Sequence, residues 1–342
     1  MSFSGKRVLL TGHTGFKGAW LLAWLDMLGA KVAGLALAPP SDPSLFALLD
    51  GAALCAAHTL GDIRDAALVR KTVEDFVPDY VVHMAAQPLV LPSLAAPVET
   101  FATNVIGTAH VLDACRHASP KAILVVTSDK VYANDGSPHA FVEADRLGGH
   151  DPYSASKAAC EITLDSFRSS YFAGKVPLAT ARAGNVIGGG DWAAYRIVPD
   201  AVRALAANST LVLRRPEAVR PWQHVLDPLA GYLAILENGC DGAFNFGPEA
   251  AARRTVREVV EEFGKAFDGK PGWTIENANP PPEAPYLTLS AAHARDTLGW
   301  APKLDFETAM AWTAAWYRAW IDGADMGKVT RAQIEAFGKI GV

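Results

Sequence analysis

Residues 8–18 read Val-Leu-Leu-Thr-Gly-His-Thr-Gly-Phe-Lys-Gly, and this stretch decides the fold of the chain. The apolar run from Val8 to Thr11 predicts a buried strand, and the apolar residues from Phe16 to Leu28 recur at helical spacing. Gly29 supplies a stop for that helix. The backbone can turn tightly between strand and helix, because three evenly spaced glycines stand there: Gly12, Gly15 and Gly18. The stretch therefore predicts the first strand, turn and helix of an α/β fold.

The alternation of strands and helices continues through the first half of the chain. Further apolar runs predict strands at Lys31–Leu37, Tyr80–Met84, Ile123–Thr127 and Leu178–Ala183, and the stretches between them predict helices such as Val98–Arg116 and Tyr153–Tyr171. Strands without strict alternation that are separated by helices indicate a parallel sheet covered on both faces. After about residue 185, glycine, proline and tryptophan become dense and the alternation ends. The sequence predicts a Rossmann-type, doubly wound parallel sheet over residues 1–185. It also predicts a smaller, irregular lobe over residues 186–342 that mainly binds substrate, with some exchange of segments between the two.

The composition of the chain indicates which classes of binding partner to expect. The 342 residues are half hydrophobic and carry a net charge of −5 without a basic block, so we expect no nucleic-acid partner, which would need a clustered basic face. The chain has no apolar run of about 18 residues and no signal core, which predicts no membrane partner and a cytoplasmic location. The four cysteines form no Cys-x-x-Cys pair, which predicts neither a metal site nor disulfides and fits a reducing compartment.

The glycine loop carries the first chemical prediction. At the first strand-to-helix turn, the Gly-x-x-Gly-x-x-Gly spacing lets a dinucleotide pyrophosphate rest on the helix N-terminus, although glycine-rich turns also arise for structural reasons alone. After the second predicted strand the chain reads Ala36-Leu-Ala-Pro-Pro-Ser41, with neither an acid for the adenosine ribose nor an arginine for a 2′-phosphate. That region leaves both NAD and NADP open. Asp62 either holds the adenine or caps a helix.

A second pattern supplies a proton relay. Tyr153 and Lys157 are four positions apart on a predicted helix and project from one face. A nearby ammonium favours the phenolate form of a tyrosine, which makes the phenol a usable base near neutral pH. A lone Tyr-x-x-x-Lys pair is typical of a helix surface, but Ser128 adds a hydroxyl at the end of the intervening strand. Combined with the glycine loop, these residues favour a catalytic site over a surface pair.

Several longer runs resemble a known family. In chain order they are TGHTGFKG, HMAAQPLV, TSDKVY, LGGHDPYSASK, RAGNVIGGGDW and RPWQHVLDPLAGYL, and they extend over nearly the whole chain. They resemble the extended short-chain dehydrogenase/reductase family, and within it the nucleotide-sugar 4,6-dehydratases that act on CDP-glucose. The resemblance implies NAD as cofactor and a CDP-hexose as substrate. It also implies a homodimer or a dimer of dimers, built on helices near residues 100–116 and 153–171.

The resemblance further implies a role for each residue that matches a family motif. The implied catalytic residues are Ser128, Asp129, Lys130, Tyr153 and Lys157. The implied cofactor contacts are Gly12, Thr14, Gly15, Phe16, Gly18, Asp62, Ile63, Ala85, Ala86, Asn104, Tyr153 and Lys157. The implied substrate contacts are Gln87, Asn185, Asp191, Trp192, Arg214, Arg220 and His224. Guanidinium groups suit the substrate pyrophosphate, because they match phosphate oxygens bidentately.

The implied reaction explains the polar run Thr127-Ser-Asp-Lys130 at a strand tip. Oxidation at sugar C4, with Tyr153 taking the hydroxyl proton, acidifies the C5 hydrogen; water then leaves from C6 and the hydride returns to C6. The resemblance implies Asp129 as the acid for the departing C6 hydroxyl and Lys130 as the base at C5. The other interpretation of this pair is a surface feature that ends the strand. A 4-epimerase or reductase on the same fold would not need the pair, and a non-catalytic NAD-binding regulator would not need the relay.

Two segments depart from the family pattern. Leu91-Pro-Ser-Leu94 stands where Arg-x-Ser-Tyr is typical, and His139-Ala-Phe-Val-Glu143 stands where Trp-Gly-Tyr-Arg-Glu is typical. The departures remove two arginines and two aromatic residues from a region that we expect to border the sugar. They leave the identity of the sugar nucleotide open.

Overall fold

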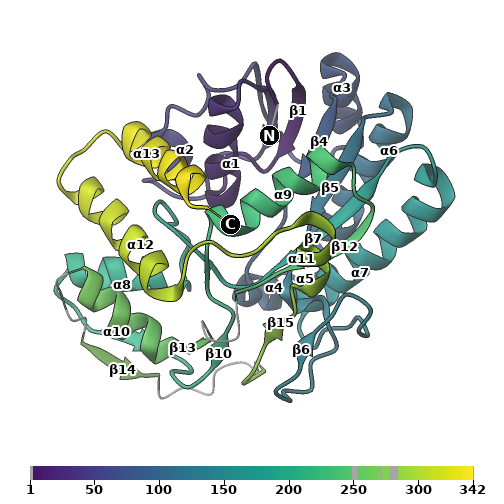
Figure 1. The fold of residues 1–342 in the computed structure, drawn as a ribbon. Coiled ribbons are helices and arrows are strands. Elements are labelled where there is room, and N and C mark those ends of the chain that lie inside the picture. Colours follow the sequence, from purple (N-terminus) through teal and green to yellow (C-terminus); the bar gives the residue numbers. More distant parts are fainter. Residues whose placement is uncertain (1–2, 249–252, 268, 270–271, 277–283, 342) are drawn as a thin grey trace.

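The centre of the molecule is a seven-stranded parallel sheet (Figure 1). A computed structural model describes residues 3–248, 253–267, 269, 272–276 and 284–341. The strand order is β12-β7-β5-β4-β1-β2-β3, so the order reverses at β1 and leaves a crevice at the carboxyl ends of β1 and β4. This is the doubly wound arrangement that the sequence predicts. The strands are β1 (Arg7–Thr11), β2 (Lys31–Ala36), β3 (Ala57–Leu60), β4 (Tyr80–His83), β5 (Ala122–Val126), β7 (Leu178–Ala183) and β12 (Gly242–Phe246).

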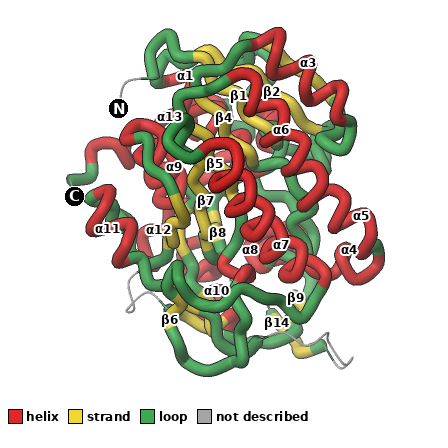
Figure 2. Tube along the Cα trace, turned by 90° about the vertical axis from the view of Figure 1, so that its right-hand side faces the viewer, coloured by secondary structure: helices red, strands yellow, loops and turns green. Residues whose placement is uncertain are grey.

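Helices cover both faces of this sheet (Figures 1 and 2). Because successive strand residues point to opposite faces, Leu9 joins one buried core and Leu10 the other. The core around Leu9 lies beneath α3 (Ala66–Phe76), α6 (Thr108–Ala118) and α7 (Pro152–Phe167). The core around Leu10 lies beneath α1 (Phe16–Met27) and α9 (Leu226–Asn238). The other helices are α2 (Leu45–Leu48), α4 (Val90–Ala95), α5 (Pro97–Phe101), α8 (Ile197–Ala206), α10 (Val256–Ala266), α11 (Ala292–Leu298), α12 (Phe306–Ile321) and α13 (Met326–Lys339).

The predicted strands are all present, and two predicted helices are interrupted. The segment predicted as one helix over Val98–Arg116 consists of α5, a π-helical turn at Ala102–Gly107, and α6. The segment predicted over Tyr153–Tyr171 is α7 followed by a π-helical turn at Arg168–Phe172. Such turns widen a helix locally and are common next to functional sites. The helix period alone does not reveal them.

Two strands of the large sheet were missed by sequence reasoning. β3 lies at the sheet edge and most of its residues are exposed, so no apolar run marks it. β12 comes from beyond residue 185 and pairs with β7, with Phe244 beside Ala181. In the opposite direction, β6 (Ala140–Phe141) pairs with β15 (Thr288–Leu289). Segments from both sides of residue 185 therefore contribute to both halves of the molecule.

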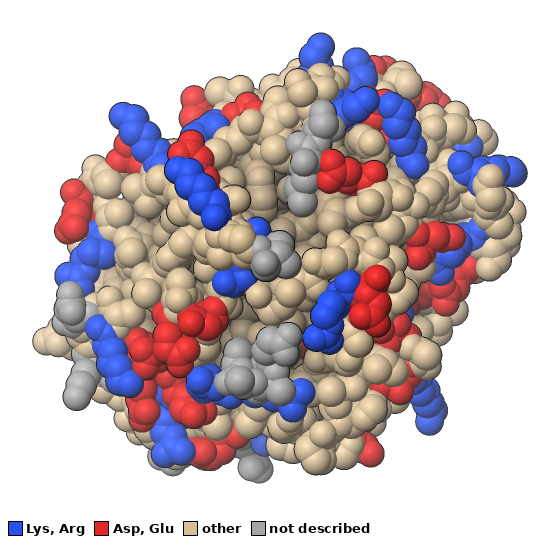
Figure 3. Space-filling model, in the orientation of Figure 1, with Lys and Arg blue, Asp and Glu red and all other residues tan. Residues whose placement is uncertain are grey.

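A smaller group of elements lies at one end of the sheet, at the lower left of Figure 1. It contains α8, α10 and two of three short strand pairs, which suits a region rich in glycine and proline, whereas the third pair directly follows β7. Among the described residues, no helix combines the length and the apolar character needed to cross a membrane. Acidic and basic side chains are interspersed on the face shown in Figure 3. The strand pairs are β8 (Val186–Ile187) with β11 (Gln223–His224), β9 (Leu211–Leu213) with β14 (Trp273–Ile275), and β10 (Val219–Arg220) with β13 (Arg254–Thr255).

Candidate active site

A cavity of about 730 Å³ opens at the carboxyl ends of the central strands. Loops that follow six strands of the sheet (β1, β2, β3, β4, β5 and β7) form one part of its wall, and residues of the smaller lobe form the other. Its position is that of the ligand crevice in doubly wound folds, and its size suits a nucleotide-sized ligand. The predicted site residues that line it are Gly12, Thr14, Gly15, Phe16, Gly18, Asp62, Ile63, Ala85, Ala86, Gln87, Ser128, Asp129, Lys130, Tyr153, Lys157, Asn185, Asp191, Trp192, Arg214 and Arg220.

The glycine loop is shaped for close approach of a ligand to the backbone. Gly12 has a φ of 75°, and a Cβ there would lie 2.7 Å from the Ala85 nitrogen. A Cβ on Gly18 would lie 2.1 Å from the Gly12 carbonyl oxygen, so the helix could not approach the strand as closely. Gly15 caps α1 without a side-chain hydrogen bond. The N–H groups of the first helical turn therefore remain available for an anionic ligand.

Asp62 lies at the cavity wall and does not cap a helix. Its carboxylate accepts hydrogen bonds from the Arg64 guanidinium at 2.6 and 2.8 Å and from the Arg64 backbone N–H. The hydrogen bonds from Arg64 lower the pKa of Asp62. The cap of α3 is Asp65, which accepts from the Leu68 N–H at 3.0 Å. The capping interpretation of Asp62 is therefore wrong, while its place in the cavity leaves a ligand contact open.

The tip of β5 carries the predicted acid and base. Ser128 accepts a hydrogen bond from the Lys130 N–H at 3.2 Å and donates its own to Asp129 Oδ1 at 3.0 Å. The Lys130 ammonium lies 3.7 Å from the same Oδ1. Asp129 is 2% exposed, and its other oxygen, Oδ2, is buried without a hydrogen-bond partner. Burying a carboxylate oxygen without a hydrogen bond costs free energy, unless a ligand donates a hydrogen bond to it.

A buried ion pair supports this tip from behind. Arg182 on β7 donates to both oxygens of Glu161 on α7, at 2.8 and 3.0 Å. Glu161 also accepts from the Thr127 hydroxyl at 2.5 Å, which ties the residue before Ser128 to the helix that carries Tyr153. Both charged side chains are almost fully buried. No local pattern in the sequence marks this pair, because its members meet only when β5, β7 and α7 come together.

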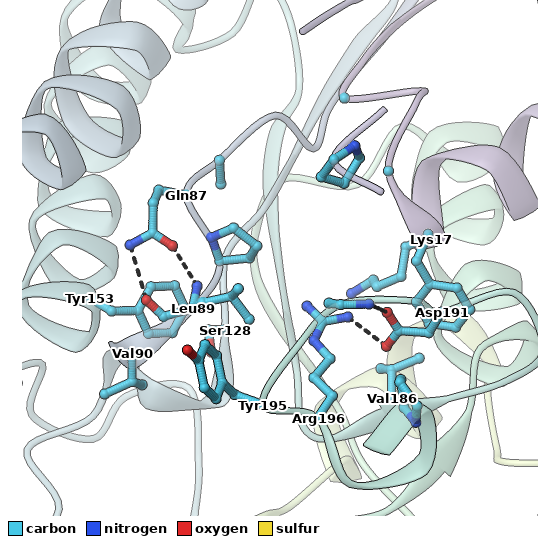
Figure 4. Close-up of a pocket in the computed structure, with 18 of the residues that line it drawn as sticks. Lys17, Gln87, Leu89, Val90, Ser128, Tyr153, Val186, Asp191, Tyr195 and Arg196 are labelled. Carbon is cyan, nitrogen blue, oxygen red and sulfur yellow. Dashed lines mark hydrogen bonds and ion pairs between the residues drawn. The ribbon is translucent and has the colours of Figure 1, made fainter. Parts of the chain in front are cut away.

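The start of α7 places Tyr153 and Lys157 on the cavity wall. Asp151 caps the helix by accepting from the Ser154 N–H at 2.9 Å, and Pro152 follows as its first residue. The Tyr153 N–H donates to Ser93 Oγ at 3.1 Å. The Lys157 ammonium donates to the Val126 carbonyl oxygen at 3.3 Å, which links the helix to the end of β5. Figure 4 shows Ser128 and Tyr153 on one side of the cavity, opposite Lys17, Asp191 and Arg196.

Asn104 lies behind the wall rather than on it. It is buried in the π-helical turn, accepts from the Gln87 N–H at 2.8 Å, and donates to the Gln87 carbonyl and to Ser156 Oγ. It is absent from the cavity lining, so the prediction of a direct cofactor contact needs correction: Asn104 holds the loop after β4 against α7. Gln87 lines the cavity, but its side-chain amide bonds to Leu89 and Thr100, which shapes the same loop.

The smaller lobe contributes the residues predicted to bind substrate. The Asn185 side-chain oxygen is buried without a partner, as is the indole nitrogen of Trp192. Asp191 accepts from Arg196 Nη1 at 2.8 Å and from the Ala193 N–H at 3.1 Å. Arg220 is 4% exposed and donates to the carbonyl oxygens of Val219 and Pro285, whereas Arg214 is only partly buried.

His224 does not reach the cavity. Its imidazole is fully buried between the rings of Trp20 and Trp312, with centroid distances of 6.1 and 5.8 Å. Burial lowers its pKa to about 3, so the ring is neutral. The predicted substrate contact is therefore wrong, because the side chain points from β11 into the hydrophobic core.

The two segments that depart from the family pattern differ in position. Leu91 lines the cavity, whereas Leu94 is exposed outside it. None of the residues 139–143 lines the cavity in the described part of the chain. Phe141 instead stacks on Tyr132 at 4.8 Å, and His139 pairs with Asp145. The expectation that this second segment borders the sugar is not met, since β6 carries it to a separate small core.

Four cations that line the cavity were not among the predicted site residues: Lys17, Arg64, Arg196 and Arg215. Lys17 had a usable signal, since it is a charged residue in the first turn of a helix whose other residues, apart from Asp26, carry no charge. Arg196 had none, because its distance from the glycine loop in sequence gives no hint that they face each other.

One group of possible metal ligands occurs among the described residues, outside the cavity lining. His13, Cys55 and His58 offer ligand atoms within 4.8 Å of one another. The two imidazoles already share a hydrogen bond of 2.8 Å, and the Cys55 thiol donates to the Gly51 carbonyl. His13 Nδ1 is buried without a hydrogen-bond partner.

The fold, the glycine loop and the tyrosine–lysine pair define an extended short-chain dehydrogenase/reductase. The chain belongs to the NAD dependent epimerase/dehydratase family, whose model matches residues 8–247. The chain is 41% identical to the CDP-glucose 4,6-dehydratase of Salmonella typhimurium, with 98% of this chain and 97% of that protein covered. Identity to the dTDP-glucose 4,6-dehydratase of Xanthomonas campestris pv. campestris is 28%, over 96% and 98% of the two chains. The structure of Thermus thermophilus UDP-glucose 4-epimerase in complex with NAD matches with a TM-score of 0.80 and 26% identity, over 91% of this chain and 99% of that one.

Proposed function

We propose that the chain is an NAD-dependent nucleotide-sugar 4,6-dehydratase that converts a CDP-hexose, with CDP-glucose as the first candidate, to the 4-keto-6-deoxy sugar nucleotide. The observation that carries the proposal is the buried Asp129 carboxyl group: its Oδ2 has no hydrogen-bond partner, and its Oδ1 lies 3.7 Å from Lys130 Nζ. A 4-epimerase or a simple dehydrogenase needs only a relay such as Ser128 and Tyr153. An additional acid and base in the same cavity suit an elimination. The relationship to the Salmonella enzyme supports the same reaction and the cytidine nucleotide.

The cavity suits NAD. Gly12 and Gly18 allow the close backbone approach that a pyrophosphate requires, and the first turn of α1 carries no side-chain cap. The described end of β2 lines the cavity with Ala36, Leu37 and Ala38, which offer no cation to a 2′-phosphate. Arg64, the next cation along the chain, is already paired with Asp62. These features favour NAD over NADP. Residues up to 185 then supply most of the cofactor site, and later residues most of the substrate site.

Tyr153 and its neighbours carry out the first proton transfer. NAD, when bound, supplies the acceptor for the C4 hydride and later the source of the hydride for C6. Tyr153 takes the proton of the C4 hydroxyl, and Lys157 favours the phenolate by its charge. Ser128 holds the C4 oxygen by a hydrogen bond. The C4 carbonyl that results lowers the pKa of the C5 hydrogen.

Asp129 and Lys130 then carry out the elimination. Lys130 takes the C5 proton, and Asp129 gives its proton to the C6 hydroxyl as the C6–O bond breaks and water leaves. A hydride returns to C6 and a proton to C5, so the cofactor finishes in the state in which it began. Asp129 Oδ2 has no protein partner and is free to meet the C6 hydroxyl. Lys130 needs a neutral amine for its step, and Asp129, whose Oδ1 lies 3.7 Å from Lys130 Nζ, must be protonated for its own. The two requirements agree, because an ionised carboxylate at that distance would favour the ammonium.

The smaller lobe holds the substrate nucleotide. Arg214 and Arg220 contact the pyrophosphate, and Arg196 and Arg215 line the same wall and add positive charge. The free side-chain oxygen of Asn185 and the indole nitrogen of Trp192 offer hydrogen bonds to the sugar or the base.

The test is incubation of the purified protein with CDP-, dTDP-, UDP- and GDP-glucose, followed by mass spectrometry of the sugar nucleotide. We expect loss of one water from the CDP-sugar and no net build-up of NADH. A product of unchanged mass would indicate the epimerase reaction, and stoichiometric NADH would indicate a dehydrogenase. If the protein binds NAD but converts none of the four sugar nucleotides, the result would support a non-catalytic NAD-binding regulator.

We further propose a cytoplasmic homodimer. Val98, Ile106 and Ile162 are 81, 52 and 62% exposed, on α5, the π-helical turn and α7 respectively. Exposed apolar side chains on neighbouring helices favour association. Light scattering of the purified protein tests the state, and a charged residue at Ile162 should give monomers. All four cysteines are free, which fits a reducing compartment.

A further inference from the structure

Lys17 is the least expected residue in the cavity. It is the second residue of α1, directly after the glycine loop, and its side chain lines the cavity. The N-terminus of a helix carries partial positive charge, so a lysine in the first turn is electrostatically unfavourable there. The other side chains of the helix are almost all apolar. A charge in this position calls for a partner of opposite sign.

The partner that the protein itself supplies is neutral. The Lys17 ammonium donates to the hydroxyl of Tyr232 on α9 at 3.1 Å and lies 5.4 Å from the centre of its ring. In the described part of the chain, no ion pair includes Lys17. Two other cations, Arg196 before α8 and Lys157 on α7, are close enough to repel it, while Asp129 attracts it. Arg196 also forms an ion pair with Asp191 at 2.8 Å.

The surroundings make the Lys17 amine easier to deprotonate than an ordinary lysine. Burial lowers the pKa of Lys17 to about 7, and repulsion from Arg196 and Lys157 adds to this effect. Tyr232 carries no charge, since burial raises its own pKa well above the usual range. An anion placed beside Lys17 would reverse the balance and favour the charged form.

We propose that Lys17 is a diphosphate-binding residue, which leaves Tyr232 and pairs with the diphosphate of a bound nucleotide. The inference rests on the proposed function, since that function brings two nucleotide diphosphates into the cavity. The charges around Lys17 indicate that it binds a diphosphate, but both the dinucleotide and the sugar nucleotide carry one. The experiment therefore tests the two ligands separately. Lys17 belongs to the loop that would carry the first and faces Arg196 on the wall that would carry the second (Figure 4).

The experiment is calorimetric titration with NAD and, separately, with CDP, each in two buffers of different ionisation enthalpy. The difference between buffers reports proton uptake on binding. We expect the wild-type protein to take up protons with the ligand that Lys17 contacts, and to take up more at pH 8 than at pH 7, since burial lowers the pKa of the free amine and a bound anion raises it again. Lys17→Met keeps the aliphatic stem, and it should weaken that ligand roughly ten- to hundredfold and remove the uptake.

Two further variants separate ligand binding from packing. Lys17→Arg keeps a charge that does not titrate, so it should retain most of the affinity and lose the proton uptake. Tyr232→Phe removes the hydroxyl that holds the ammonium in the empty cavity, and it should keep both the affinity and the uptake. If Lys17 serves only to pack on Tyr232, Tyr232→Phe should instead resemble Lys17→Met.

Unchanged affinity and proton uptake for both ligands in Lys17→Met would overturn the inference about Lys17 and leave the proposed function standing. Wild-type protein that binds neither NAD nor CDP would overturn both. Loss in the NAD arm alone assigns Lys17 to the dinucleotide, and loss in the CDP arm alone assigns it to the sugar nucleotide.

Discussion

Separating elimination from hydride transfer gives the sharpest test of the proposed active site. Asp129→Asn keeps the shape of the side chain and its Oδ1 bond to Ser128, but an amide cannot release a proton to a leaving hydroxyl. Lys130→Met keeps the apolar stem and removes the base. Neither change alters Tyr153 or Lys157, which act on the C4 hydroxyl. We therefore expect both variants to complete the first step and stall at the second.

The expected size follows from the position of the two groups. Asp129 Oδ2 is buried and accepts no hydrogen bond from the protein. No neighbouring protein group is therefore in place to donate the proton when Asp129 is replaced. A positioned acid or base contributes roughly 10²–10⁴-fold to a rate, which corresponds to a barrier about 3–5 kcal/mol higher. If elimination slows by a hundredfold or more, it becomes the slow step of the reaction. Enzyme-bound NADH should then accumulate after the first hydride transfer and decay slowly.

The assay is stopped-flow absorbance of reduced nicotinamide after mixing the NAD-loaded protein with CDP-glucose. Tyr153→Phe serves as the matched control, because a block at the first step should give no NADH transient. In D₂O the wild-type product should carry deuterium at C5, and Lys130→Met should slow that exchange. If both variants lack the transient and Lys130→Met exchanges C5 at the normal rate, then Asp129 and Lys130 are a surface feature of the strand end. The base would then lie elsewhere in the cavity.

Three other predictions test different parts of the site. Tyr153→Phe should lower kcat roughly 10²–10⁴-fold while substrate affinity, measured by calorimetry, stays near the wild-type value; a near wild-type rate would make the phenol purely structural. Arg220→Ala should raise KM much more than it lowers kcat in steady-state kinetics, because pyrophosphate binding is shared by the ground and transition states; an unchanged KM would place Arg220 outside the substrate site. Glu161→Gln should destabilise the fold by about 3–5 kcal/mol in urea unfolding, because it leaves the Arg182 guanidinium buried without its counter-charge. A shift in unfolding midpoint no larger than that of an exposed Glu307→Gln control would contradict that reasoning.

Sequence alone determined the features that depend on neighbours along the chain. The spacing of apolar residues predicts β1 and α1, and the glycine at position 12 predicts the tight turn between them, where the backbone adopts a φ of 75°. Tyr153 and Lys157 share one face because a helix repeats at that spacing. Every strand with a clear apolar run was predictable for the same reason, as was the polar tip that carries Asp129.

Only the tertiary structure decided which distant residues meet. β12 completes the sheet beside β7, although its sequence gives no sign of its partner. His224 and Asn104 belong to motifs that resemble binding sites, yet their side chains turn to the core and to a neighbouring loop. Lys17 faces Arg196 because α1 and the segment before α8 border one cavity. Burial, charge repulsion and unpartnered polar atoms arise from packing between remote segments, and a local pattern of residues does not encode which segments those are.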